Sequence, residues 1–176
     1  MMKKNGFTIV EFLVVIFIIS VLSGLSFTAY RTGEKIFALQ MSAQKLAQDI
    51  RRVEEMAISA KICGPCGNKV PPGYGIYLQQ GSTSYFIYAD TNPAKGNEIY
   101  DRKDVIVETI SFESGVFIKS VNPSSLSINF KPPDPQTRIG NSSQTLNEVS
   151  IVLSLLTDTS KTKTIKVNKA GLIYVE

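Results

Sequence analysis

The first part of the chain reads as one helix, and its first half is apolar on every side. Residues 7–30 contain a single charge, Glu11, in a run of 24 residues. As a helix this run would be about 36 Å long, enough to cross the hydrocarbon core of a bilayer. The positive charges of Lys3 and Lys4 precede it, and such charges keep the N-terminal flank in the cytoplasm. The pattern predicts a single-pass segment with the rest of the chain outside the cytoplasm.

The helical pattern continues beyond residue 30 but changes character. Apolar residues recur at steps of three and four, which predicts an amphipathic second half over residues 31–62. The members of this stripe are Ile36, Leu39, Ala43, Leu46, Ile50, Val53, Ala57 and Ala60. Its small alanines favour close packing on a sheet of the same chain, and the near-heptad spacing leaves a coiled-coil seam as the alternative. We expect Gly64 and Pro65 to end the helix.

Residues 63–176 show the alternation and turn residues of a β-rich head. Residues 74–80 and 84–89 flank Gly81 and predict a hairpin. Further strands are expected at residues 105–112, 116–120, 125–130, 148–156, 163–167 and 172–175. The proline-rich stretch 131–144 is typical of a long loop. Strands that follow one long helix predict an α+β fold, with an antiparallel sheet packed on the helical stripe.

Composition excludes several kinds of chemistry. The chain has no histidine, so a Ser-His-Asp or Cys-His nucleophile and any histidine metal site are excluded. The formal net charge is +4; without Lys3 and Lys4, 17 basic residues face 15 acidic ones and leave +2. This charge is too small to indicate nucleic-acid binding. No catalytic residues and no cofactor are predicted.

The two cysteines form one CxxC sequence, Cys63-Gly-Pro-Cys66. A structural zinc site needs four ligands, and the chain has no second pair. A thioredoxin-type redox motif begins a helix, whereas this one follows a helix and precedes a loop. An oxidising exterior favours a local disulfide between Cys63 and Cys66. An anchored thiol oxidoreductase is a weaker alternative.

Oxygen-bearing side chains gather between residues 90 and 104. They are Asp90, Asn92, Asn97, Glu98, Asp101 and Asp104. The spacing does not match an EF-hand loop, because Ala94 occupies the third ligand position and Lys95 precedes Gly96. We interpret these residues as solvated turn residues. A looser calcium-stabilised turn, with Asp90, Asn92, Glu98 and Asp101 as ligands, is the alternative.

Glu11 calls for an explanation because it lies only four residues into the apolar run. A carboxylate at mid-helix costs about 2.5–3.5 kcal/mol on insertion scales, and less near an end. The sequence offers it no partner nearby, but cleavage after Gly6 would create one, the free amine of Phe7. The amine of one helix could meet the carboxylate of a staggered neighbour, and in a low dielectric this pair would set the register of assembly. An uncut signal anchor and an ordinary secretory signal are the alternatives, although residues 22–26 match a signal-peptidase site poorly.

The segment KKNGFTIVEFLVVIFIISVL resembles the processing site of type IV prepilins. It has a basic leader, Gly6 before the cut, Phe7 after it, and Glu11 at the fifth mature position. The resemblance implies a leader of residues 1–6, removal of this leader by an inner-membrane prepilin peptidase, and N-methylation of Phe7. It also implies that residues 7–30 pack with the helices of other pilin subunits in a filament core.

Within that family, four head segments resemble the minor pilins and pseudopilins of the general-secretion H and fimbrial T/U kind. These segments are GYGIYL, YADTN with the following GNEIYDRKD, FKPPD and IKVNKAGLIYVE. The resemblance implies a minor subunit of a type IV pilus, a type II secretion pseudopilus or a competence filament. Such a subunit starts in the inner membrane and ends in a periplasmic or cell-surface filament. The alternative is a membrane-anchored module that captures a ligand, or DNA in a competence system, although the head lacks a basic-aromatic stripe.

Overall fold

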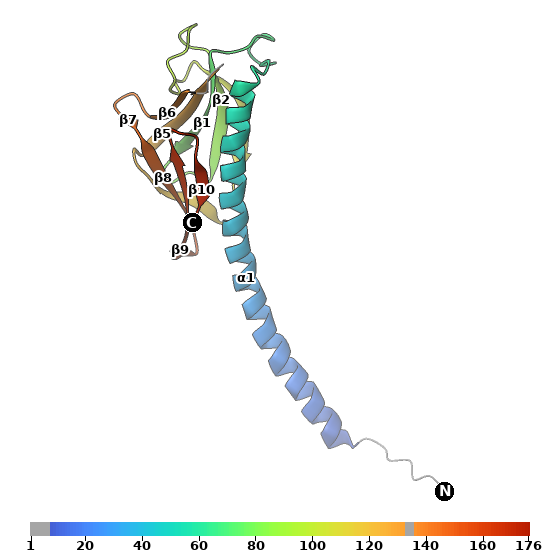
Figure 1. The fold of residues 1–176 in the computed structure, drawn as a ribbon. Coiled ribbons are helices and arrows are strands. Elements are labelled where there is room, and N and C mark those ends of the chain that lie inside the picture. The colour runs from blue at the N-terminus through green and yellow to red at the C-terminus, as the bar shows by residue number, and fades with distance from the viewer. Residues whose placement is uncertain (1–7, 133–135) are drawn as a thin grey trace. The chain divides into compact units, whose positions relative to one another are not determined.

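The computed structural model describes residues 8–132 and 136–176, with the side chains of residues 25–29, 31, 32 and 136 left out. The chain divides into two units, Met1–Phe37 and Ala38–Glu176, and each is described by itself. Helix α1 (Ile9–Ile58) begins in the first unit and ends in the second (Figure 1). Among the described side chains, no helical stretch is both long and apolar enough to cross a membrane.

Helix α1 ends at Ile58, four residues before the end predicted from the sequence. Ala60 takes a left-handed conformation with φ of 46°. The N–H of Lys61 then donates to the carbonyl of Met56, and the N–H of Ala60 to that of Ala57, both at 3.0 Å. These two bonds form a Schellman cap, which satisfies the last carbonyls of the helix. The prediction that Gly64 and Pro65 stop the helix was wrong, because the chain has already left the helix at Ala60.

The apolar stripe of α1 forms part of the core of the second unit. Six of its predicted members are buried there: Leu39, Ala43, Leu46, Ile50, Val53 and Ala57. They join one hydrophobic cluster with residues from both sheets, so the stripe packs on its own chain. The prediction was wrong for Ile36, which lies before this unit and is 43% exposed. It was also wrong for Ala60, which lies beyond the helix end and is exposed.

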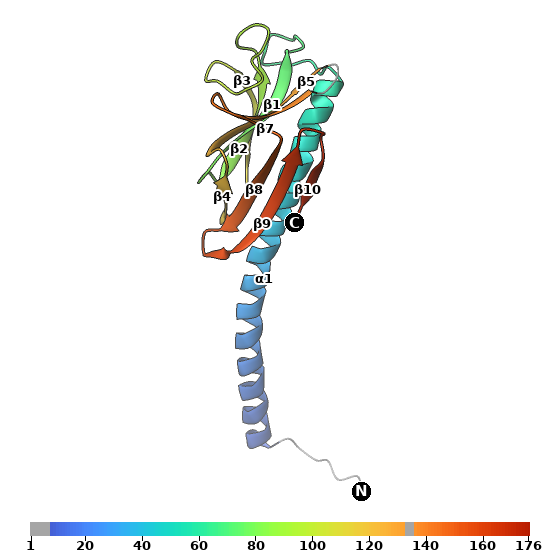
Figure 2. The same cartoon turned by 60° about the vertical axis from the view of Figure 1, so that its left-hand side comes forward.

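The head contains two antiparallel sheets, so the predicted α+β class is confirmed with two sheets in place of one. The larger has the order β3 (Val105–Ser111), β2 (Ser84–Asp90), β1 (Gly73–Gln79), β5 (Ser125–Lys131), β6 (Gln136–Gly140) and β7 (Thr145–Leu146). The smaller has the order β10 (Ile173–Val175), β9 (Asp158–Asn168), β8 (Glu148–Leu155) and β4 (Val116–Val121). Figure 2 shows β9 and β10 of the smaller sheet alongside α1.

The stretch expected to be a loop, residues 131–144, contains strand β6 and was therefore wrongly predicted. In β6 the side chains of Thr137 and Ile139 are buried, and Ile139 pairs with Ile128 of β5. The alternation of buried and partly exposed residues in β6 is short and follows three prolines, which are typical of a loop. Strand β9 is also longer than expected, because its polar first residues continue the hairpin with β8.

The two faces of the larger sheet differ. On one face, Ile76 of β1 lies between Ile87 of β2 and Ile128 of β5, and all three are buried in the core. The other face carries aromatic rings, among them Tyr88, which pairs with Gly75. A Cβ atom at Gly75 would overlap the ring of Tyr88, so this position requires glycine.

Hydrogen bonds attach α1 to each sheet of the head. Nη2 of Arg51 donates to the carbonyl of Ile173 in β10 at 2.7 Å. The hydroxyl of Tyr85 in β2 donates to Oδ2 of Asp49 at 2.6 Å. Burial and this bond to the Asp49 carboxylate raise the pKa of Tyr85 above its usual value. The second half of α1 is therefore a structural element of the head.

Candidate assembly site and the polar loop of the head

Two parts of the chain hold candidate functional residues: the start of α1 and the loops that connect strands of the larger sheet. Lys3, Lys4, Gly6 and Phe7 lie outside the described residues. The description begins at Thr8, directly before α1. The cleavage site itself therefore stays a prediction, whereas the hydrogen bonds at the start of the helix are part of the structure.

Thr8 and Glu11 cap the first turn of α1. The backbone N–H and the hydroxyl of Thr8 both donate to Oε2 of Glu11 at 3.0 Å. In return, the backbone N–H of Glu11 donates to Oγ1 of Thr8 at 3.2 Å. This reciprocal arrangement is a capping box, and it satisfies amide groups that have no partner within the helix. The expectation that Glu11 has no partner nearby was wrong, and the Thr-x-x-Glu spacing is the sequence signal that was missed.

The capping box occupies only one oxygen of the carboxylate. Both bonds from Thr8 end on Oε2, and within the described residues Oε1 accepts none. A carboxylate can accept several hydrogen bonds, so Oε1 remains open to a donor from another molecule. Thr8 therefore orients Glu11 without using up its capacity to bind a partner.

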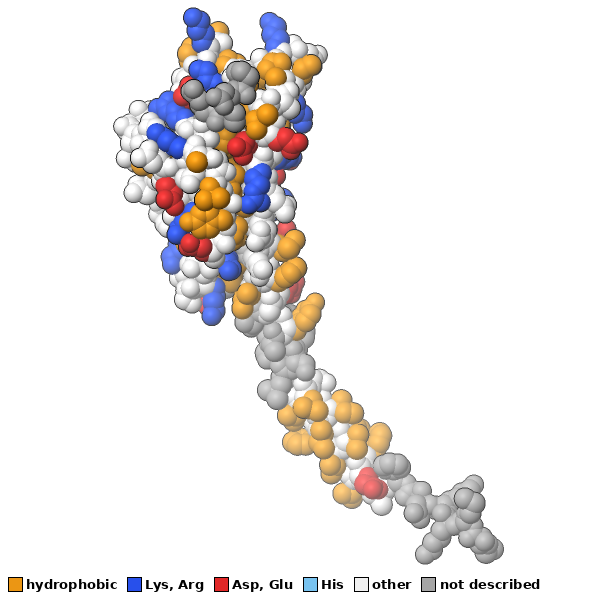
Figure 3. All heavy atoms as spheres, viewed as in Figure 1, with side chains coloured by type: hydrophobic (Ala, Val, Ile, Leu, Met, Phe, Trp, Pro, Cys, Tyr) orange, Lys and Arg blue, Asp and Glu red, His pale blue; other side chains and the backbone are white. Residues whose placement is uncertain are grey.

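The helix next to this cap exposes apolar side chains on every side. The large apolar residues from Ile9 to Leu22 are all exposed within this unit, Phe17 at 69%. Figure 3 shows apolar side chains covering this part of the helix on the face in view. The hydroxyl of Ser20 donates to the carbonyl of Ile16 at 2.8 Å, so this polar group is satisfied within the helix. A helix that is apolar all round needs cover from lipid or from other protein.

Residues 1–27 match the family described as the prokaryotic N-terminal methylation motif. The predicted prepilin-type motif is confirmed by this match. No curated protein matches the chain. Among solved structures, the minor pseudopilin EpsH from the type 2 secretion system of Vibrio cholerae is similar at 13% identity and a TM-score of 0.45. The alignment covers 78% of this chain and 95% of that one. The more specific resemblance to the H and T/U kinds stays a prediction.

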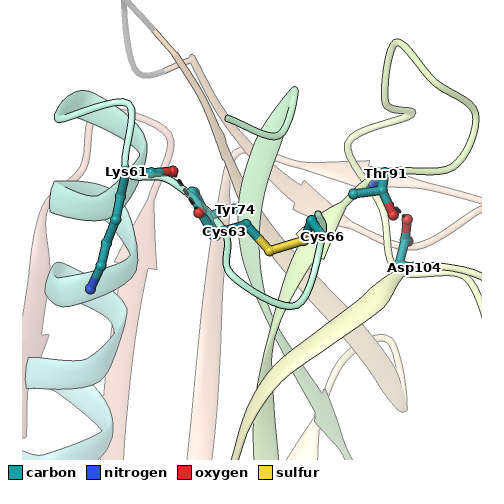
Figure 4. The surroundings of a disulfide bond; sticks show 6 residues. All are labelled: Lys61, Cys63, Cys66, Tyr74, Thr91 and Asp104. Atoms are coloured by element: carbon teal, nitrogen blue, oxygen red, sulfur yellow. Dashed lines mark hydrogen bonds between the residues drawn. A yellow bond between two sulfur atoms is a disulfide. The ribbon is translucent and has the colours of Figure 1, made fainter. Parts of the chain in front are cut away.

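Cys63 and Cys66 are joined by a disulfide in the structure (Figure 4). Cys63 is buried, and its N–H donates to the carbonyl of Lys69 at 2.9 Å. Nearby, the hydroxyl of Tyr74 donates to the carbonyl of Lys61 at 2.7 Å. The cysteines lie in the loop that leads from the helix cap to β1, so Cys63 does not begin a helix as a redox-active cysteine of the thioredoxin type does.

The carboxylates of Asp90 and Asp104 organise the loop between β2 and β3. Asp90 accepts the backbone N–H of Asn97 at 3.1 Å and that of Glu98 at 2.6 Å. Asp104 accepts the backbone N–H groups of Thr91, Asn92 and Asp101 at 2.8–3.0 Å. Both side chains are buried, Asp90 with only 1% exposure. The interpretation as solvated turn residues was wrong for these two, because they replace the missing backbone partners of the loop.

Burial changes the acidity of these carboxyls. Desolvation outweighs the backbone hydrogen bonds and raises the pKa of Asp90 to about 6. The pKa of Asp104 is raised for the same main reason. Across the part of the chain that is described, no three acidic or cysteine side chains are placed to hold a metal ion. In the structure, Asn92 donates to Asp101 at 2.6 Å, so two members of the suggested calcium turn bond to each other.

The loop presents Tyr100 to the aromatic face of the larger sheet. Its N–H donates to Oγ of Ser127 at 3.0 Å. The ring of Tyr100 lies 4.8 Å from that of Tyr77, 4.7 Å from Phe86 and 5.3 Å from Tyr88, measured between centroids. Rings at these separations pack favourably. This cluster was not predicted, although the alternate aromatic positions in the 74–89 hairpin could have indicated it.

Proposed function

We propose that this protein is a structural subunit of a filament of the type IV pilin kind. The filament would be a type IV pilus, a type II secretion pseudopilus or a competence filament, and the chain would be one of its minor components. The methylation motif at residues 1–27, read together with the helix that is apolar on every side, carries this proposal. In this role the chain is the substrate of a prepilin peptidase and performs no catalytic step.

The exposed apolar surface of α1 indicates two successive environments. An apolar helix whose backbone is hydrogen-bonded internally is stable in a bilayer, so the precursor is held in the inner membrane by residues 7–30. The positive leader keeps the N-terminus in the cytoplasm and leaves the head outside. After cleavage, helices of neighbouring subunits cover the same apolar surface in the filament.

Glu11 selects how these helices align. Thr8 fixes Oε2, and the amine of Phe7 from a neighbouring subunit pairs with the open Oε1. A charge pair inside an apolar bundle is strongly favoured over either charge left alone, because the low dielectric penalises an unpaired charge. Only the stagger that joins the two groups is then compatible with assembly.

The first experiment examines processing in the native cell. Mass spectrometry of the mature protein is expected to find Phe7 as a methylated N-terminal residue. Gly6→Ala is expected to leave most of the protein at its full length. A mature chain that begins at Met1, or beyond residue 30, would contradict the proposal.

The second experiment separates processing from assembly. Glu11→Ala removes the register pair and is expected to be cleaved normally but to be lost from purified filaments. Glu34→Ala is the matched control, because it removes an exposed carboxylate from the same helix outside the apolar run. Normal incorporation of the Glu11→Ala protein would refute the register argument, whereas loss of both variants would show that total charge matters instead.

A further inference from the structure

The head contains a cavity that the filament role does not use. Its volume is about 200 Å³, and it lies against the aromatic face of the larger sheet. Its lining includes Tyr77 of β1 and Ser125 of β5, Tyr100 and Arg102 from the loop between β2 and β3, and Asn141 from the turn between β6 and β7. Segments that are distant in the sequence therefore converge on one small pocket.

The polar groups around this pocket are mainly unused donors. Within the described residues, the guanidinium of Arg102 and the hydroxyl of Ser125 have no hydrogen-bond partner. The side-chain oxygen of Asn141 accepts the N–H groups of Ser143 and Gln144 at 2.9 and 3.0 Å, which leaves its NH₂ group as the open donor. A ligand that satisfies these groups carries acceptors, and a carboxylate can accept two parallel hydrogen bonds from a guanidinium.

Asp101 also lines the pocket, and each of its two carboxylate oxygens accepts a hydrogen bond from the loop. Asp101 accepts Nδ2 of Asn92 at 2.6 Å and the backbone N–H of Lys103 at 2.7 Å. Its carboxylate is therefore already engaged in holding the loop. Arg102 has no such partner among the described residues, so its charge is available to a ligand.

Two tyrosine rings supply the apolar part of the pocket. The rings of Tyr77 and Tyr100 are half-buried and lie 4.8 Å apart. Aromatic rings offer a broad apolar face together with a polar edge, which suits a ligand with one apolar face and several hydroxyl groups. A pyranose ring has this character, and a cavity of this size holds about one such ring.

The walls of the pocket are held in place before any ligand arrives. The buried carboxylates of Asp90 and Asp104 fix the loop that carries Tyr100 and Arg102. The bond from the Tyr100 N–H to Ser127 attaches this loop to β5. A binding site whose backbone is already ordered loses less conformational entropy on binding, so that here the exposed side chain of Arg102 is the main group left to be ordered.

We propose that this pocket binds one uronic-acid unit of an acidic polysaccharide. The sugar ring packs against Tyr77 and Tyr100, its carboxylate pairs with Arg102, and its hydroxyl oxygens accept from Ser125 and Asn141. The inference concerns the head alone and does not depend on whether the chain enters a filament.

The test uses the full chain in micelles of a detergent without a sugar headgroup. Isothermal titration calorimetry with trigalacturonate is expected to show saturable binding, and the neutral galactotriose is expected to bind at least about tenfold more weakly. Arg102→Ala is expected to weaken the binding of trigalacturonate by about tenfold or more. Lys103→Ala is the matched control, because it removes the same charge one residue away and outside the pocket.

Three results with the proteins and sugars above would overturn the inference, and a further variant adds a fourth. One is the absence of saturable binding of trigalacturonate to the unmodified protein. Another is equal affinity for the acidic and the neutral trisaccharide. The third is an equal loss in the Arg102→Ala and Lys103→Ala proteins, which would indicate general attraction of charge in place of a site. Tyr77→Leu, which keeps an apolar side chain on β1, is expected to weaken binding as well, and unchanged affinity would also count against the pocket.

Discussion

Leu13 and Leu46 belong to the same helix but meet opposite conditions. Leu46 has no exposed surface in the head, whereas Leu13 is 60% exposed in the N-terminal unit. In the second half of α1 the head supplies the cover for one apolar stripe, and the remaining faces are mostly polar, with Met41 and Ile58 as exposed apolar residues. In the first half the apolar surface extends around the helix, and every described side chain of this unit is exposed. The contrast shows which part of the helix stabilises the head and which part keeps its apolar surface exposed.

The two units also differ in the hydrogen bonds that their polar groups make. In the first unit the bonds are local, since Thr8 bonds to Glu11 and Ser20 to Ile16. In the head, Arg51 bonds to Ile173, and Oγ of the buried Ser42 accepts the N–H of Glu113. Local bonds survive when the surroundings of a helix change, whereas long-range bonds exist only while the head is folded. A helix that moves from lipid to protein needs the first kind.

The largest expected effect is on the free energy of unfolding of the head, when a leucine of each unit is replaced by alanine. Leu46→Ala is expected to lower the free energy of unfolding of the head by about 3 kcal/mol, because it leaves a cavity in a packed core. Leu13→Ala is expected to change it by less than about 0.5 kcal/mol, since Leu13 contributes nothing to that core. Thermal unfolding of the full chain in micelles, followed by near-UV circular dichroism, measures both. Equal losses in the two variants would mean that the N-terminal half of α1 does stabilise the head.

A smaller effect is expected from pH, and it arises only in the head. The pKa of Asp90 is raised from 3.8 to about 6, so between these values the folded state binds the proton more tightly than the unfolded state does. Stability from this group is present in full below pH 4 and is lost as the pH rises through 6. The expected loss is roughly 2 kcal/mol, measured from urea unfolding at a series of pH values between 4 and 7.

Asp90→Asn provides the control for this dependence. The amide cannot ionise, so the variant is expected to lack this decrease, although it is less stable overall because its NH₂ group faces backbone donors. Subtracting the two pH profiles removes the contributions of other carboxyls, such as Asp104, whose raised pKa acts in the same direction. Parallel profiles for both proteins would show that Asp90 titrates normally in the folded state.

Much of the fold could be predicted because it depends on periodicity. The stripe from Leu39 to Ala57 repeats at helical spacing, and most strands show alternation between turn residues. Strand β6 was missed because prolines precede a pattern of only five residues. The capping box of Thr8 and Glu11 was visible in the sequence, but the open Oε1 was not, since it depends on the geometry of the bonds.

The polar loop could not be predicted for a different reason. Asp90 and Asp104 bond to backbone N–H groups, which every residue except proline has, so no sequence pattern identifies their partners. The same acidic residues fit a solvated turn, a calcium loop or a buried scaffold equally well. The convergence of Tyr100, Arg102 and Asn141 on one pocket follows from that scaffold, and it was therefore hidden as well.

The smallest expected effect concerns the point where α1 ends. Ala60 occupies the left-handed position of the Schellman cap with φ of 46°, a conformation that costs a residue with a Cβ atom roughly 1 kcal/mol and costs glycine almost nothing. Ala60→Gly is therefore expected to raise the free energy of unfolding of the head by a little under about 1 kcal/mol, because glycine also gives up more freedom on folding. Ala57→Gly, three residues earlier in the last turn of the helix, is expected to lower it by about 1 kcal/mol or more, because glycine is the poorer helix former and the buried methyl group is lost. Both values come from urea unfolding at one pH. A gain in the free energy of unfolding for Ala60→Gly and a loss for Ala57→Gly would locate the helix end at Ile58. A loss for both variants would indicate that the helix continues to Gly64 and Pro65.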